Sequence, residues 1–136
     1  MRTGGRAGSL LLAALLTLAT GCTQTSSGSS ASSLADAITR AVYANDYDGT
    51  VEHFDADTKA QVTRGDLGQL SDQMHRLGAY QGLTQTNADP DRGLYDFDLK
   101  FANGHMTAKV RLDPSGRVGA YRVLPGAPAP ATPTTG

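Results

Sequence analysis

Residues 93–113 decide the fold: Gly93-Leu-Tyr-Asp-Phe-Asp-Leu-Lys-Phe-Ala-Asn-Gly-His-Met-Thr-Ala-Lys-Val-Arg-Leu-Asp113. Two alternating runs flank Asn103-Gly104, and Asn-Gly is the strongest short signal for a two-residue hairpin turn. A turn centred there places Phe101 opposite Met106 and Phe97 opposite Val110. One face of this hairpin is then apolar: Tyr95, Phe97, Leu99, Phe101, Met106, Ala108, Val110 and Leu112. The other face is polar and pairs Asp98 with Lys109 and Asp96 with Arg111. Turn chemistry, alternation and charge pairing therefore agree on a half-buried antiparallel hairpin.

Further strands extend this hairpin on both sides. Asp113-Pro-Ser-Gly116 is typical of a type I turn, and it pairs Leu112 with Val118 at the start of a last strand, residues 117–124. The same register places Arg122 opposite Ala108, on the apolar face. A weaker strand runs from Tyr80 to about Ala88. The sequence therefore predicts a four-stranded antiparallel meander.

Helical patterns precede the strands. Ser33-Leu-Ala-Asp36 resembles a capping box, and the helix that it opens ends near Asn45. Asp48 is expected to cap a short second helix. A third helix starts after Thr63 and ends at Gly78. Helices followed by strands indicate an α+β fold, in which N-terminal helices pack on a curved four-stranded meander sheet.

The N-terminus has the parts of an export signal. Arg2 and Arg6 precede an uncharged run over residues 10–19, which is too short to span a membrane stably. Leu18-Ala-Thr-Gly-Cys22 resembles the lipobox of bacterial lipoproteins. This resemblance implies cleavage after residue 21, a lipid on Cys22, and anchoring at the outer face of the bacterial cytoplasmic membrane. The alternative is ordinary signal cleavage near Gly21 that leaves an unmodified thiol.

Composition divides the rest of the chain and limits its partners. The 136 residues contain 12 Lys and Arg and 13 Asp and Glu, so loss of Arg2 and Arg6 leaves a net charge of about −3. That balance argues against nucleic acid as a partner and leaves the lipid as the membrane anchor. Because Cys22 is the only cysteine, no internal disulfide can form. The predicted segments are a signal peptide (1–21), a flexible tether (22–33), a folded domain (34–125) and a disordered Pro- and Thr-rich tail (126–136).

The folded part is similar to a known superfamily. The stretches that carry the resemblance are Asn45-Asp-Tyr47, Val51-Glu-His-Phe-Asp55, Leu70 with Gly78 and Tyr80, Phe97 with Phe101-Ala-Asn-Gly104, and Val110-Arg-Leu-Asp113 with Gly116-Arg-Val-Gly119. Together they resemble the nuclear transport factor two-like superfamily of cystatin-like cones, near a domain family of unknown function in bacterial exported proteins. The resemblance implies a cone-shaped module that binds a small molecule, dimerises or serves as an accessory domain. None of these motifs is catalytic.

Four side chains are candidates for lining a pocket. Arg122 on the apolar face would grip a carboxylate, or its strand bulges and the side chain reaches solvent. His53, beside the apolar Phe54, could face the hollow as an acid–base group. Tyr95 and Tyr43 are expected to line the core or pocket. The spacing of the three histidines matches no metal site, and no cofactor motif is present.

These patterns favour a lipid-anchored module of the cell envelope that binds a small apolar ligand or a protein partner. The alternative is a small enzyme of the isomerase or dehydratase kind that uses the cone cavity. The enzyme would need His53 and Arg122 to line one closed pocket. A weak homodimer through the charged outer face of the sheet is a further possibility.

Overall fold

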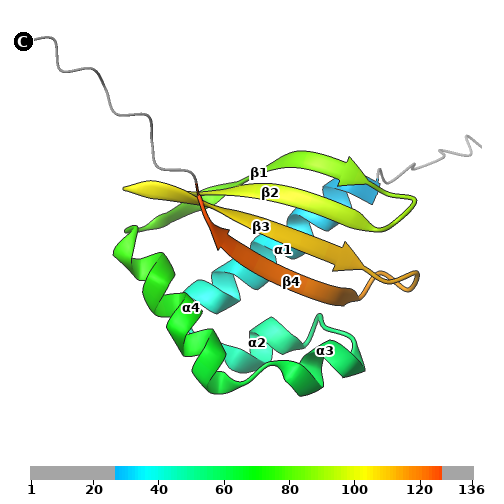
Figure 1. Ribbon diagram of the computed structural model, residues 1–136, viewed down its shortest axis with the longest axis horizontal. Coiled ribbons are helices and arrows are strands. Elements are labelled where there is room, and N and C mark those ends of the chain that lie inside the picture. Colours follow the sequence, from blue (N-terminus) through cyan, green and yellow to red (C-terminus); the bar gives the residue numbers. More distant parts are fainter. Residues whose placement is uncertain (1–26, 127–136) are drawn as a thin grey trace, which may run out of the picture.

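The computed structural model describes residues 27–126, in which helices precede strands (Figure 1). The helices are α1 (Ser27–Tyr43), α2 (Tyr47–Val51), α3 (Ala56–Gln61) and α4 (Arg64–Arg76). The strands are β1 (Tyr80–Asp89), β2 (Leu94–Phe101), β3 (Gly104–Leu112) and β4 (Val118–Pro125). All strands are antiparallel and lie in the order β1-β2-β3-β4, with the helices on one face of the sheet (Figure 1). The predicted α+β class and meander are confirmed, whereas the signal peptide, the lipobox and Cys22 lie outside the described residues.

Local signals set several helix ends correctly. Thr63 caps α4, where its hydroxyl accepts the backbone N–H of Asp66 at 3.1 Å. Gly78 follows α4 with φ +85°, and Asn45 follows α1 with φ 55°. The predicted cap of the second helix is wrong by two residues. Asp46, not Asp48, caps α2 and accepts the N–H of Gly49 at 3.0 Å.

Two helical segments were not predicted. Residues 27–33, expected to be part of the tether, form the first turns of α1, and Ala31 there is buried against the core. Packing of that face outweighs the weak helix preference of the Ser- and Gly-rich sequence. Asp55 caps the short helix α3 by accepting the N–H of Thr58 at 2.7 Å. Asp57 lies in the first turn of the same helix.

The register of the central hairpin differs from the prediction by two residues. Phe97 lies opposite Ala108, not Val110, and Phe101 lies opposite Gly104. The turn occupies Ala102 and Asn103, whose backbone N–H groups donate to the carbonyls of Ala79 (2.9 Å) and Leu77 (2.8 Å). These tertiary bonds move the turn one residue toward the N-terminus. Because the shift in pairing is even, every side chain keeps its predicted face.

The β3–β4 register is correct only at its start. Leu112 pairs with Val118 as expected, but a bulge at Gly119 then shifts the pairing by one residue. Arg122 therefore lies opposite Lys109 on the outer face and is exposed. The register that places it opposite Ala108 is wrong, and the stated alternative, a bulged strand whose Arg122 reaches solvent, is confirmed. The same shift turns Tyr121 inward.

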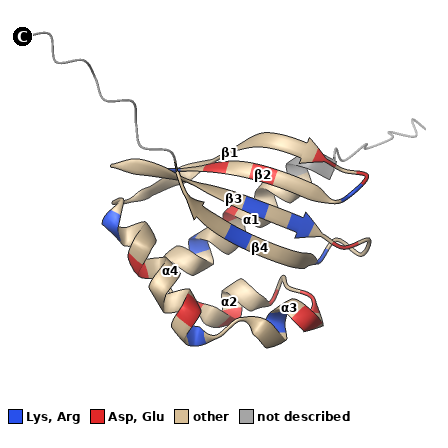
Figure 2. Ribbon diagram, in the orientation of Figure 1, with Lys and Arg blue, Asp and Glu red and all other residues tan. Residues whose placement is uncertain are grey.

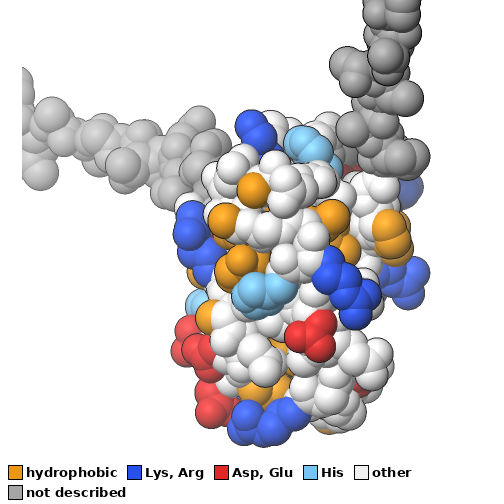
Figure 3. All heavy atoms as spheres, turned by 90° about the vertical axis from the view of Figure 1, so that its left-hand side faces the viewer, with side chains coloured by type: hydrophobic (Ala, Val, Ile, Leu, Met, Phe, Trp, Pro, Cys, Tyr) orange, Lys and Arg blue, Asp and Glu red, His pale blue; other side chains and the backbone are white. Residues whose placement is uncertain are grey.

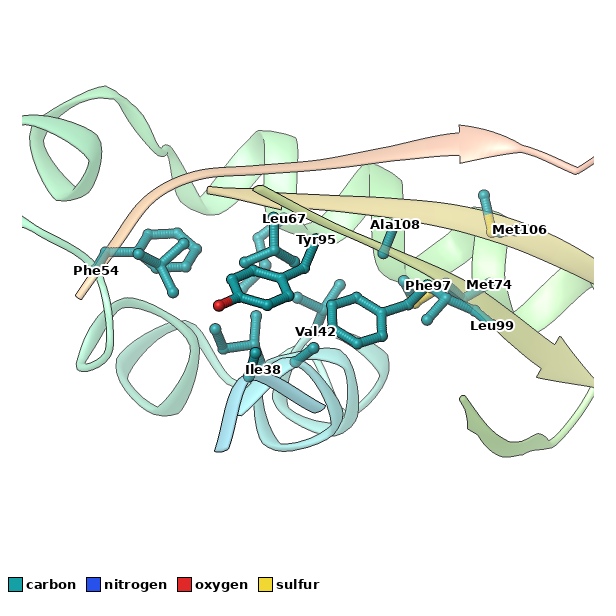
Figure 4. Close-up of a cluster of buried hydrophobic side chains, with 14 of the residues drawn as sticks. Ile38, Val42, Phe54, Leu67, Met74, Tyr95, Phe97, Leu99, Met106 and Ala108 are labelled. Carbon is teal, nitrogen blue, oxygen red and sulfur yellow. The ribbon is translucent and has the colours of Figure 1, made fainter. Parts of the chain in front are cut away.

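The core fills the space between the sheet and the helices. Figure 4 shows Tyr95 and Phe97 pointing from the sheet toward Ile38 and Val42 of α1. Phe97 and Leu99 are fully buried. Burial of one such large side chain stabilises the fold by about 1.5–3 kcal/mol, so the predicted apolar face holds the two layers together.

Candidate functional site

The two predicted tyrosines belong to the packed interior. Tyr95 is 4% exposed and lies within the core. Tyr43, at the end of α1, donates its hydroxyl to the carbonyl of Gly78 at 3.3 Å and stacks on His75 with ring centroids 4.1 Å apart. These contacts fasten α1 to the end of α4. Both positions agree with a lining or core role, but the two side chains do not share a pocket.

The two predicted ionisable residues lie apart on the surface. His53 follows α2, and its Nε2 lies 3.1 Å from Glu52 Oε1. Its backbone carbonyl accepts the N–H of Val118, which fixes the start of β4. Arg122 is exposed on the outer face of the sheet. These two side chains therefore do not line one closed pocket.

Tyr121 is the interior residue that the sequence reasoning missed. Its hydroxyl lies 2.8 Å from Thr39 Oγ1 on α1, and the Thr39 hydroxyl donates to the carbonyl of Ala35 at 2.7 Å. Since a threonine has one hydroxyl proton, Tyr121 donates to Thr39. Burial raises the pKa of Tyr121 above its ordinary value. Gly119 was the available signal, because a glycine inside a strand pattern often marks a bulge.

A cavity of about 140 Å³ adjoins Tyr121, between helices α1, α2, α4 and strand β4. Its lining comprises Val42, Thr50, Phe54, Val62, Asp66, Leu67, Leu70 and Tyr121. Among these, Phe54 and Leu67 can be followed in Figure 4. A cavity of about 150 Å³ lined by aliphatic groups holds one molecule the size of benzene. The space is therefore suited to a small apolar molecule.

The polar groups of this cavity have partners within the protein. The Thr50 hydroxyl donates to the carbonyl of Asp46 at 2.6 Å, and the Tyr121 hydroxyl is bonded to Thr39. The exposed Asp66 accepts the hydroxyl of Thr63 at 2.7 Å. These bonds leave mainly hydrocarbon to face the cavity, and they provide no free acid–base pair.

Residues 27–126 also have other hollows, one of which lies on the outer face of the sheet. No group of three or more His, Cys, Asp or Glu side chains in this range could hold a metal ion. No helix in the described part of the chain combines the length and apolar character that a membrane span needs. A hollow of about 260 Å³ lies between the end of α4, the start of β3 and the end of β4. Figure 3 views that end of the molecule and shows hydrophobic side chains as small separate areas between charged and polar atoms.

The comparisons with known proteins do not assign the chain to a family. No family model, curated protein or solved structure matches it. The likeness to nuclear transport factor two-like domains therefore rests on the sequence motifs alone.

Proposed function

We propose that this protein is a lipid-anchored, non-enzymatic module of the bacterial cell envelope that binds a small apolar ligand. The observation that carries the proposal is the cavity of about 140 Å³, lined mainly by apolar side chains. Its hydroxyl groups are satisfied within the protein, so an apolar occupant loses no hydrogen bonds on entry. Chemistry by an acid–base pair would need free ionisable groups facing the same space. The candidates for such a pair, His53 and Arg122, lie apart.

The anchoring part of the proposal rests on residues outside the described range. The lipobox-like sequence ends at Cys22, five residues before the first described residue, Ser27. Two or more acyl chains on Cys22 would hold the domain stably at the outer face of the cytoplasmic membrane. Mass spectrometry of the N-terminal peptide should detect the lipid mass. An unmodified Cys22 thiol on the exported protein would contradict the anchoring.

Ligand binding is tested with two variants that each introduce the chain's only tryptophan. Leu70→Trp fills the cavity, whereas Leu124→Trp adds the same side chain on the outer face, where Leu124 is 37% exposed. Benzene added to the full chain should shift the backbone NMR signals of Val42, Leu67 and Tyr121. The shifts should persist in Leu124→Trp and disappear in Leu70→Trp.

Native mass spectrometry of the protein isolated from membranes should show a small apolar adduct that Leu70→Trp abolishes. Equal benzene responses in the wild type and both variants would refute the cavity as the binding site. An envelope protein in place of a small adduct would favour a partner-binding role.

A further inference from the structure

A separate groove lies on the face of the sheet that no described helix covers (Figure 1). Its volume is about 520 Å³, within the range of about 300–1,000 Å³ that is usual for small-molecule sites. All four strands contribute to its lining: Asn87, Leu94, Asp96, Lys109, Val110, Arg111, Ala120 and Arg122. The groove is on the opposite side of the sheet from the apolar cavity, so the two sites are independent.

Positive charge predominates in this groove. Figure 2 shows basic positions side by side on β3 and β4, next to acidic positions on β2. Lys109 Nζ lies 3.0 Å from Asp96 Oδ2, and Arg111 interacts electrostatically with the Asp55 carboxylate. Arg122 is therefore the cation of the three that lacks an acidic neighbour within the described part of the chain. Arg111 donates to the carbonyl of Gly119 at 3.2 Å, which holds its guanidinium in place. Arg122 has no hydrogen bond or ion pair with any residue of the described range 27–126.

The bulge at Gly119 creates this concentration of charge. It places Lys109 directly opposite Arg122, and Arg111 is two residues from Lys109 on the same face. Like charges directly opposed on neighbouring strands are unfavourable. An anion between them would remove the repulsion, and the small side chain of Ala120 leaves space for it beside Arg122.

We propose that this groove binds a small soluble organic anion that carries a carboxylate or phosphate next to an apolar group. The Arg122 guanidinium would grip the anion through two parallel hydrogen bonds, with Lys109 as a second donor. The apolar part would lie against Leu94, which is 39% exposed and is one of the two exposed large apolar side chains in the described range. The combination of one free guanidinium and an exposed leucine selects an amphiphilic anion over a simple inorganic one.

The test compares a charged probe with its neutral counterpart. The full chain in neutral detergent is titrated with 4-phenylbutyrate, phenyl phosphate and the uncharged 4-phenylbutanol, and backbone NMR shifts are followed. The two anions should shift residues 94–96, 109–111 and 120–122, and added salt should weaken their binding. Shifts that are equal for the alcohol and the anions, or that are confined to the apolar cavity, would overturn the proposal.

Matched variants distinguish anion binding in the groove from a general effect of the protein's net charge. Arg122→Gln should weaken anion binding at least tenfold, and Arg122→Lys should restore only part of it because lysine cannot bind bidentately. Arg76→Gln removes the same charge from the exposed end of α4 and should leave binding unchanged. Unchanged affinity in Arg122→Gln would refute the assignment. Binding only to vesicles that contain anionic lipid, with no binding of the free anions, would also refute it in favour of membrane contact.

Discussion

The hydrogen bond between Thr39 and Tyr121 joins α1 to the inward-turned part of β4, and a double-mutant cycle tests it. Thr39 is fully buried. Its hydroxyl donates a hydrogen bond to the carbonyl of Ala35 and accepts one from the hydroxyl of Tyr121. Thr39→Val keeps the shape but leaves the Tyr121 hydroxyl without an acceptor. The expected loss of stability is about 1–3 kcal/mol, the desolvation cost of an unpaired buried hydroxyl.

Tyr121→Phe removes the donor instead. Thr39 keeps its bond to Ala35, so the expected loss is smaller, about 0.5–1.5 kcal/mol. In the double variant no polar atom is left without a partner, and the total loss should be well below the sum of the single losses. The coupling free energy is therefore expected to be about 1–2 kcal/mol.

Urea unfolding of the four proteins, followed by circular dichroism with the m-values compared, measures the cycle. In thermal unfolding, a change of 1 kcal/mol corresponds to roughly 4–8 °C for a domain of this size. If the two single losses of stability sum to the loss in the double variant within about 0.5 kcal/mol, the hydrogen bond does not couple the two residues. A smaller loss for Thr39→Val than for Tyr121→Phe would refute the assigned direction of donation.

The same tyrosine predicts an alkaline effect. Because burial raises the pKa of Tyr121 in the folded state, the unfolded chain releases this proton first as the pH rises past about 10. Stability is therefore complete below that pH and decreases above it. Tyr121→Phe should reduce the slope of this decrease in urea-unfolding measurements between pH 9 and pH 11. An unchanged slope would contradict burial of the hydroxyl.

Three further predictions test the fold. Phe97→Ala, at a fully buried position, should destabilise by about 3–5 kcal/mol in urea unfolding, and a loss below about 1 kcal/mol would contradict its core position. Gly93 and Gly116 both have positive φ, but an added Cβ meets the backbone carbonyl of Leu112 only at Gly93. Gly116→Ala should therefore cost about 1–2 kcal/mol and Gly93→Ala clearly more, and equal melting temperatures would contradict the close approach. Hydrogen bonds to the Asp113 carboxylate lower its pKa, so it stabilises the fold above about pH 4 and loses that effect as the pH falls further. Asp113→Asn should have a lower melting temperature than the wild type at pH 7, and the difference in melting temperature should be smaller at pH 3.

Local chemistry was sufficient for much of this fold. Thr63 and Gly78 mark the two ends of α4, and Asn45 follows α1, as their capping preferences indicate. Phe97 and Val110 lie on the same buried face, as the alternation predicts. Each of these features depends on a residue and its immediate neighbours.

The candidate sites were much less predictable. The cavity is lined by residues of three helices and a strand, and one of its polar members, Tyr121, faces inward only because of the bulge. The bulge itself depends on distant contacts. The backbone N–H of Val118 donates to the carbonyl of His53, and its carbonyl accepts the N–H of Asp55. The carbonyl of Gly119 accepts hydrogen bonds from Thr58 and Arg111. Local patterns alone therefore left two positions open for Arg122, inside or at a bulge facing solvent, and did not indicate that Tyr121 faces inward.

The sequence by itself determined that helices precede a strand meander and which side chains of the central hairpin face the core, since period-two alternation is a local property of the backbone. Only the tertiary structure decided how far neighbouring strands slide along each other. Hydrogen bonds from the turn to the carbonyls of Leu77 and Ala79 moved the hairpin turn by an amount that preserved both faces. The contacts around Gly119 shifted β4 by one residue, which reversed its two faces relative to a regular ladder and placed Arg122 in the outer groove.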